Sequence, residues 1–236
     1  MDRVDVSETG GRAASPGATA SRLAALRVSL PKFCTATALT ALSGFNDAVG
    51  YSALGHLYLS FMSGNSTHFG MSLASGDWPG LLLAGSIIGT FVAGTSLGTV
   101  IADRFPQSMA PRILGIELVI MLWAVAASYF GAGPLALVPV AGAMGMQNVL
   151  HQVIGGADVG KGFVTGSLFA LGQSLARLAS GREQGAAAFQ NGWSWLSFVA
   201  GVCIGALTYG TLGLPAALGA AAIALAVMLC WLGTAR

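Results

Sequence analysis

A polar motif occurs twice in this chain, each time inside a stretch of apolar residues. In the first copy, residues 44–47 read Gly-Phe-Asn-Asp and residues 61–65 read Phe-Met-Ser-Gly-Asn. In the second, residues 145–148 read Gly-Met-Gln-Asn and residues 163–167 read Phe-Val-Thr-Gly-Ser. Polar residues that recur inside membrane segments are typical of transporters and channels, which form a solute path between internal repeats. The duplication therefore favours a path between two related halves.

The composition places the chain in a membrane. Charged residues make up 8% and hydrophobic residues 54% of the 236 residues, whereas soluble domains contain about 25% charged residues. The mean hydropathy of +0.72 agrees with this. A net charge of +2 is too small to indicate a nucleic-acid partner. Cys34, Cys203 and Cys230 have no metal-ligand spacing, and we predict neither a metal nor a cofactor.

Apolar runs follow a polar N-terminal segment. Residues 1–31 mix small residues and Pro with scattered charges, which predicts a flexible cytoplasmic tail. About 20 apolar residues are needed to cross the hydrocarbon of a bilayer. Four runs are convincing spans by their length: 81–102, 113–132, 193–212 and 215–233. Two more are long enough but contain the polar motif, 33–54 and 134–155, and two are short and polar, 57–76 and 160–176.

The distribution of Lys and Arg favours one topology. If all eight runs cross, Arg104, Arg112 and Lys161 lie opposite the basic tail, which violates the positive-inside rule. If the two short runs enter and return on one side, every Lys and Arg is cytoplasmic, as are both termini. We therefore predict an all-α membrane protein with six crossings plus two re-entrant or broken helices. The alternative is eight spans in a parallel 4+4 repeat.

The repeat extends beyond the polar motif. Gly85, Gly89 and Gly94 match Gly201, Gly205 and Gly210 in spacing, and Pro and Gly recur at both ends of residues 111–115 and 215–219. The predicted halves are residues 32–133 and 134–236. Three crossings in each half make the two halves inverted relative to one another, which places a functional site near the midplane where they meet. The glycines themselves are explained by close helix packing.

Two carboxylates fall inside predicted membrane segments. We interpret Glu117 as an interfacial group that snorkels or pairs with Arg112. Asp47 belongs to the repeated motif, and its counterpart is the neutral Asn148. Two hypotheses for Asp47 stay open: proton or cation coupling, and an interfacial or helix-pairing carboxylate.

Hydroxyl, amide and imidazole groups surround the two Gly breaks. After Gly64, residues 65–67 are predicted to cap a helix start, and residues 165–167 to do the same in the second half. His68 and His151 are candidates for a gate or relay, or simply for bonds to neighbouring helices. The predicted solute or ion pathway comprises Asn46, Asp47, Ser63, Gly64, Asn65, Ser66, Thr67, His68, Gln147, Asn148, His151, Thr165, Gly166 and Ser167.

These motifs resemble those of the YoaK-like family of bacterial inner-membrane proteins, a family of unknown function with six transmembrane segments. The resemblance covers residues 33 to 233. Its most specific part is a Met-Thr-Gly-Asn signature, which reads Met-Ser-Gly-Asn at residues 62–65 and keeps the hydroxyl. The resemblance implies a multi-pass protein of a bacterial inner membrane and implies no substrate.

Three function classes follow. The first is a transporter or channel for a small solute, with proton or cation coupling as an option. The second is a non-catalytic membrane scaffold or complex subunit, in which glycine faces serve assembly. A membrane-embedded enzyme ranks last, because no nucleophile with a base at a recognisable spacing accompanies the polar residues, and we predict that the chain is not an enzyme. The predicted partners are the lipid bilayer and an unknown small solute, with a homo-oligomer left open.

Overall fold

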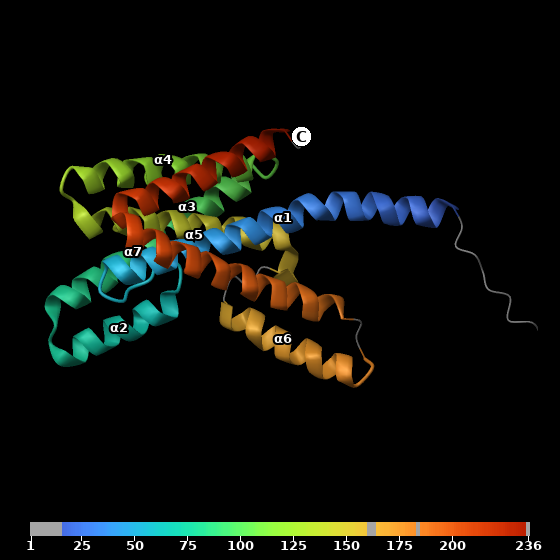
Figure 1. The fold of residues 1–236 in the computed structure, drawn as a ribbon, viewed down its shortest axis with the longest axis horizontal. Helices are drawn as coiled ribbons and strands as arrows, with labels where there is room; N and C mark the ends of the chain where they lie inside the picture. Colours follow the sequence, from blue (N-terminus) through green and yellow to red (C-terminus); the bar gives the residue numbers. More distant parts are fainter. Residues whose placement is uncertain (1–15, 160–163, 183–184, 235–236) are drawn as a thin grey trace, which may run out of the picture.

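A computed structural model describes residues 16–159, 164–182 and 185–234, and side chains are described from residue 33 except within 151–163. The described part is all-helical, with no strand (Figure 1). The helices are α1 (Pro16–Ala53), α2 (Met62–Ser75), α3 (Trp78–Arg104), α4 (Met109–Tyr129), the 3-10 helix η1 (Gly133–Leu137), α5 (Val138–Val159), α6 (Val164–Ala179) and α7 (Ala186–Thr234). Helix α1 begins within the segment predicted to be a tail.

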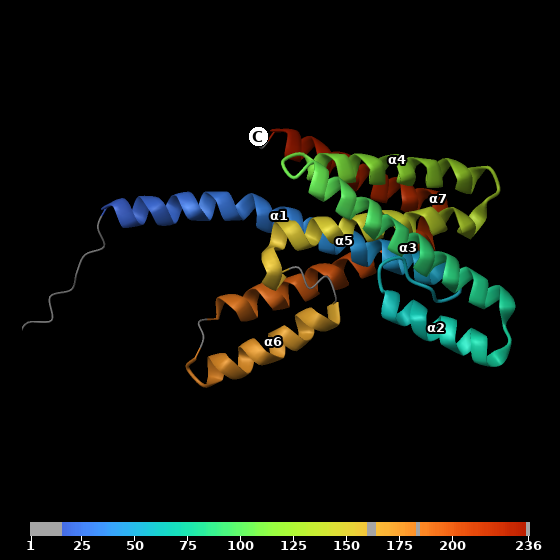
Figure 2. The same ribbon diagram turned by 180° about the vertical axis from the view of Figure 1, so that it is seen from behind.

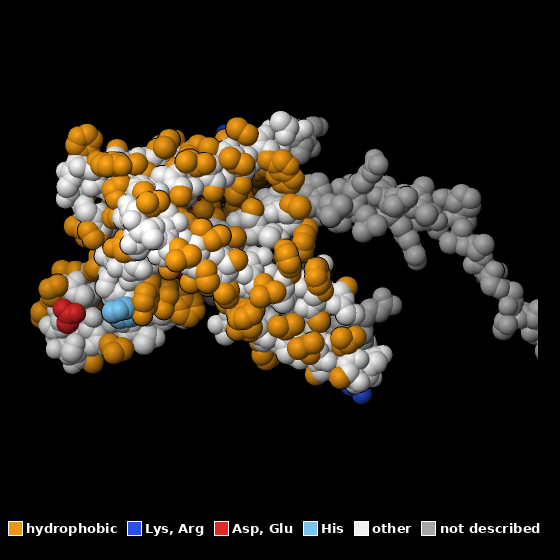
Figure 3. Space-filling model, viewed as in Figure 1, with side chains coloured by type: hydrophobic (Ala, Val, Ile, Leu, Met, Phe, Trp, Pro, Cys, Tyr) orange, Lys and Arg blue, Asp and Glu red, His pale blue; other side chains and the backbone are white. Residues whose placement is uncertain are grey.

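Long apolar helices confirm an all-α membrane protein. Within the described ranges, four helical segments are long and apolar enough to cross a membrane: Trp78–Arg104, Met109–Tyr129, Gly133–Leu150 and Ala186–Thr234. Large apolar side chains such as Leu82 and Val119 are exposed on them. Figure 3 shows such side chains across the visible face of the molecule. This surface suits lipid, because lipid chains impose no penalty on exposed apolar groups.

Helix ends follow local chemistry. Gly76 ends α2 in the left-handed region with φ 72°, and Asp77 caps α3 by accepting a hydrogen bond from the Gly80 amide at 3.2 Å. Helix α7 is two helices in direct succession, because Gly213 has φ 78° and ψ 178° inside it and Pro215 follows. Only glycine adopts that backbone conformation without strain. The break falls between the predicted spans 193–212 and 215–233.

Helices α1 and α5 run through the centre of the molecule in opposite directions (Figures 1 and 2). Each is followed by a short helix that starts near the middle and runs outwards, α2 after α1 and α6 after α5. Each short helix then forms a hairpin with the next long helix, α3 or α7. Helix α2 has 14 residues and spans about 21 Å, whereas the hydrocarbon core is about 30 Å thick. Neither its length nor its starting point suits a full crossing.

The turns lie at two opposite ends of the bundle. The α3–α4 and α6–α7 turns and the C-terminus lie at one end, and the α2–α3 turn and η1 lie at the other (Figure 1). Arg104, Arg112 and Arg182 belong to the first end, and all three are exposed. Asp77 lies in the α2–α3 turn at the opposite end. These three Arg side chains therefore lie at one end of the bundle, where the exposed Asp103 also lies.

Small residues allow the long helices to approach each other closely. A Cβ on Gly94 would collide with the Gly142 carbonyl of α5, and a Cβ on Gly201 would collide with the Ala41 carbonyl of α1. The α3–α5 and α1–α7 contacts are thus backbone to backbone. Thr95 strengthens the α3–α5 contact by donating a hydrogen bond from Oγ1 to the Gly145 carbonyl at 3.2 Å.

The glycines that make equivalent contacts in the two predicted halves are not the pairs that were matched by sequence spacing. Gly94 contacts α5 as Gly201 contacts α1, and Gly98 lies against Met146 as Gly205 lies against Phe45. Gly85 meets only the Phe69 ring, and Gly89 and Gly210 meet nothing within 4 Å. Regular glycine spacing along both helices gave several plausible matches. Only the packing partners select one of them.

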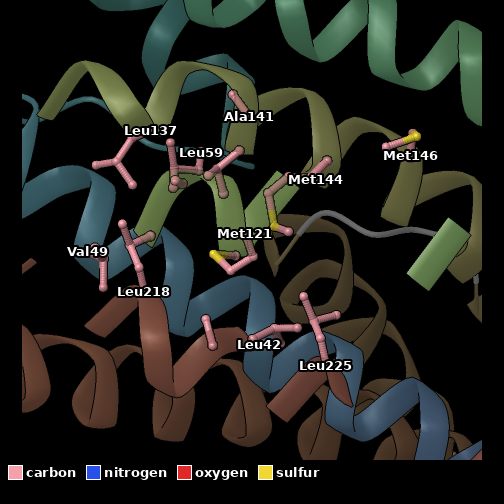
Figure 4. Packing of buried hydrophobic residues seen from close by; sticks show 14 of the residues in the cluster. Leu42, Val49, Leu59, Met121, Leu137, Ala141, Met144, Met146, Leu218 and Leu225 are labelled. Carbon is pink, nitrogen blue, oxygen red and sulfur yellow. The ribbon is translucent and has the colours of Figure 1, made fainter. Parts of the chain in front are cut away.

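The buried core lies among α1, α4, α5 and the second part of α7 (Figure 4). Leu42 and Val49 of α1, Met121 of α4, Met144 of α5 and Leu225 of α7 are buried together in one cluster. Helices α2 and α6 stand outside this core and each pack mainly on the long helix that follows. Polar side chains at the inner ends of α1 and α5 must therefore be satisfied within a largely apolar interior.

We predict that Gly94→Val and Gly201→Val both lower the thermal stability of the purified protein in detergent. The added side chain has no space against a neighbouring backbone, and such overpacking costs about 1–3 kcal/mol or more. Gly89→Val and Gly210→Val are matched controls, because nothing lies within 4 Å of a Cβ at either position. Equal melting temperatures for all four variants would show that these helices do not pack as described.

Candidate functional site

Asp47 holds the connection between α1 and α2. Its side chain is 2% exposed. Oδ1 accepts hydrogen bonds from the backbone amides of Leu59 and Ser60, at 2.8 and 2.6 Å, and Oδ2 accepts one from Ser60 Oγ at 2.7 Å. These donors lie in the non-helical connection just before α2. Both carboxylate oxygens are thus occupied by one short segment, and Asp47 is an anchor for it.

Asn65 holds the same connection from the other side. The side chain is fully buried, its Oδ1 accepts a hydrogen bond from the Tyr58 amide at 2.8 Å, and its Nδ2 donates to the Tyr58 carbonyl at 2.7 Å. The amide therefore pairs with both polar backbone groups of one residue. Backbone groups removed from water must find such partners. Asp47 and Asn65, from the two parts of the first motif, together satisfy the amides of residues 58–60 and the Tyr58 carbonyl.

The predicted capping role of residues 65–67 is wrong. Helix α2 begins at Met62, so these residues lie inside it. Ser66 Oγ and Thr67 Oγ1 donate to carbonyls of their own helix, at Met62 and Ser63, and Ser66, Thr67 and Ser63 are exposed. Gly64 is also helical, and its missing side chain leaves room for the rings of Phe61 and Tyr58, within 3 Å of a Cβ there. The helix break lies earlier, in residues 54–61.

The second motif occupies corresponding places. Residues 165–167 lie inside α6, which begins at Val164, so capping of a helix start by them is also wrong. Thr165 is exposed, and Gly166 and Ser167 are half-buried. Asn148 is half-buried on α5, and the His151 side chain and residues 160–163 lie outside the described part. His68 is half-buried on α2.

Asn46 and Gln147 connect α1 and α5 where these helices cross. Both side chains are 1% exposed. Asn46 Nδ2 contacts Met144 Sδ of α5 at 3.5 Å, and Gln147 Nε2 donates to the Leu39 carbonyl of α1 at 3.2 Å. Each amide thus reaches from its own helix to the other. Gln147 Oε1 is buried and has no partner among the described residues.

The interpretation of Glu117 as an interfacial carboxylate is wrong. Its side chain is fully buried, and neither oxygen has a hydrogen-bond partner in the described part of the chain. Arg112, the predicted partner, is exposed instead: its guanidinium lies 3.8 Å from the centre of the Phe105 ring and its Nε donates to Ser108 Oγ at 3.1 Å. Because i, i+4 positions share one helix face, Glu117 follows Ile113 and precedes Met121 on the buried face of α4.

The residues of the predicted pathway therefore lie in different surroundings. Asp47 and Asn65 form a structural anchor, Asn46 and Gln147 form an interior polar pair, and the hydroxyls of α2 face outwards. Glu117 was predicted to lie at the interface, and it lies in the buried interior instead. The sequence carries no clear signal for this burial, because α4 is apolar on all faces, with Val119 and Leu122 exposed and Met121 buried. No group of three or more His, Cys, Asp or Glu side chains suited to a metal occurs in the described part.

These features define a multi-pass, all-α membrane protein with polar side chains in a closely packed interior. Residues 35–231 match the family described as Protein of unknown function (DUF1275), and the chain belongs to that family, in agreement with the YoaK-like resemblance. The UPF0700 transmembrane protein RA0705 of Rhizobium meliloti (strain 1021) is 35% identical over 170 residues, which cover 72% of each chain. No solved structure matches the chain.

We predict that Asp47→Asn speeds hydrogen exchange at the amides of Leu59 and Ser60. The carboxamide keeps the size of the side chain, but its neutral oxygen is a weaker acceptor than a carboxylate oxygen, so the hydrogen bonds from both amides weaken, at a cost of about 1–2 kcal/mol. Exchange measured by mass spectrometry on peptides covering residues 54–61 checks this. Ser66→Ala, which removes a hydroxyl bonded within α2, should leave the exchange unchanged.

Proposed function

We propose that this protein is a small-solute transporter or channel of a bacterial inner membrane, with the solute site between its two halves. It has six crossings and two re-entrant helices, α2 and α6. The halves 32–133 and 134–236 are inverted repeats, and both termini are cytoplasmic. The chain has no catalytic role in this proposal. The substrate class is a small polar solute, because the interior offers amide and carboxyl groups rather than a wide apolar cavity.

One observation carries the proposal: Asn46 and Gln147 occupy corresponding places in the two motifs and reach across to each other's helix. Polar side chains inside a membrane protein are costly, and they are found where they pair or where they line a solute path. The Asn46 partner is a thioether sulfur, which is a weak acceptor. The side-chain oxygen of Gln147, Oε1, has no partner in the described part. This pair is therefore poorly satisfied by the protein alone and suits exchange with a solute.

The arrangement of the helices supports the same function. Transporters with inverted repeats place their sites near the midplane, where discontinuous helices of the two halves meet. Helices α2 and α6 both start near the middle of this molecule, on either side of the α1–α5 crossing (Figure 2). Gly94 with α5, and Gly201 with α1, make equivalent close contacts across the halves. The halves are thus related by contacts as well as by motif.

The packing weakens the scaffold alternative. That alternative relied on glycine faces that serve assembly with other proteins. Gly94, Gly98, Gly201 and Gly205 instead contact α1 and α5 of the same chain. These four glycines are therefore not free for a partner, and of the glycines matched by sequence only those outside these contacts, such as the exposed Gly89 and Gly210, remain for one.

The proposal is tested by a solute screen followed by flux measurements. Small polar solutes are first tested for thermal stabilisation of the purified protein, because a ligand of the native state raises its apparent stability. The stabilising solute is then assayed for uptake into proteoliposomes. Asn46→Ala and Gln147→Ala each remove polar groups at the crossing, and we expect weaker solute binding by roughly tenfold to a hundredfold, corresponding to about 1–3 kcal/mol.

Ser96→Ala is the matched control for these flux measurements. Ser96 is exposed on α3, and its hydroxyl donates to the Val92 carbonyl of the same helix at 2.9 Å. Uptake by this variant should equal that of the unmodified protein. Folded Asn46→Ala and Gln147→Ala variants with unchanged solute binding and uptake would remove the crossing from the solute path.

A further inference from the structure

We propose that Glu117 is an exchangeable proton-binding site in the interior of the protein. The observation behind it is a carboxyl group that is fully buried with both oxygens unpartnered in the described part of the chain. An ionised carboxylate without a partner is very unfavourable away from water, whereas the protonated form is neutral and adds a hydrogen-bond donor. The neutral form is therefore the one that this environment accommodates.

The described side chains of the elements packed against α4 bring no compensating charge, and His151 and Asp158 of α5 lie outside that part. Helix α4 packs on α5, on the second part of α7, on η1 and on α3. Residues 133–150 and 214–234 contain no Asp, Glu, His, Lys or Arg, and the Cys230 thiol is exposed. The charged groups at the end of α3, Asp103 and Arg104, are exposed, as is Arg112 on α4 itself. Within the described side chains, Glu117 thus has neither a basic partner nor a second carboxylate nearby on these elements.

A second unpartnered buried oxygen lies on the neighbouring helix α5. Helices α4 and α5 form an antiparallel hairpin through η1 (Figure 1). Glu117 lies about three turns before the end of α4, and residues 147–150 lie about three turns after the start of α5. Met121 and Met144, one turn closer to the connection, belong to one buried cluster (Figure 4). Gln147 Oε1, the other unpartnered buried oxygen, lies on this neighbouring helix.

The same surroundings favour a proton over a metal cation. Glu117 and Gln147 offer three unpartnered oxygens in total, whereas a hard cation such as Ca²⁺ takes 6–8 oxygen ligands. The rest of the α4 face, Ile113 and Met121, is apolar and fully buried. A proton needs neither extra ligands nor extra volume. Proton binding at Glu117 does not depend on the proposed transport function. Only the use of this proton to drive solute movement rests on that function.

The experiment uses the full-length protein in liposomes and the lipid-soluble reagent dicyclohexylcarbodiimide, which modifies protonated carboxyl groups in apolar surroundings. Modification of Glu117 is measured by mass spectrometry of peptides at mildly acidic and mildly alkaline pH. We expect Glu117 to be modified several-fold more at acidic pH. Asp47, whose oxygens accept three hydrogen bonds, is the internal comparison and should be modified far less.

Three results would overturn the proposal. The first is an absence of Glu117 modification at both pH values, and the second is modification that does not change with pH. The third is protection of Glu117 by sodium chloride but not by choline chloride, because such protection would identify a cation site. Glu117→Gln mimics the neutral carboxyl, so it should keep its melting temperature and lose the labelled peptide. A Glu117→Gln protein that fails to fold would also contradict a neutral Glu117. Labelling requires no solute, so a negative transport screen leaves this test unaffected.

Discussion

The structure depends on satisfying backbone polar groups away from water. Residues 54–61 are not helical, and the amides of residues 58–60 bond to side chains instead of to a helical backbone. Asp47 and Asn65 supply the missing partners at residues 58–60. This allows α1 to end, the chain to turn back towards the middle, and α2 to start there. The first polar motif is therefore explained by what this non-helical connection requires of its neighbours, before any solute is considered.

Close helix packing is the second requirement, and small residues meet it in both halves. Gly94 and Gly201 bring α3 onto α5 and α7 onto α1, respectively. The crossing of α1 and α5 then follows, with Asn46 and Gln147 at its centre. Because these contacts are backbone to backbone, they leave little room for adjustment. The interior polar groups are therefore held in fixed positions by the glycine contacts around them.

Much of the fold could be predicted from sequence, because apolar length and helix-breaking residues are local signals. The predicted spans 81–102 and 113–132 correspond to α3 and α4, and the separation of the last two spans falls at Gly213. The start of α2 at Met62 was missed, because the connection that precedes it is held by Asp47 on another helix. The burial of Glu117 was missed because it depends on α5 and α7 covering one face of α4. Partners distant in sequence decide both features.

If α2 is re-entrant, the end of α1 and the start of α3 lie on the same side of the membrane. His56, exposed in the connection after α1, and Asp77, exposed before α3, mark these two points. Each is replaced by Cys, one at a time, in a chain with Cys34, Cys203 and Cys230 changed to Ser. A membrane-impermeant thiol reagent applied to intact cells should label both positions. Labelling of one position from outside and of the other only after permeabilisation would place them on opposite sides and contradict the account.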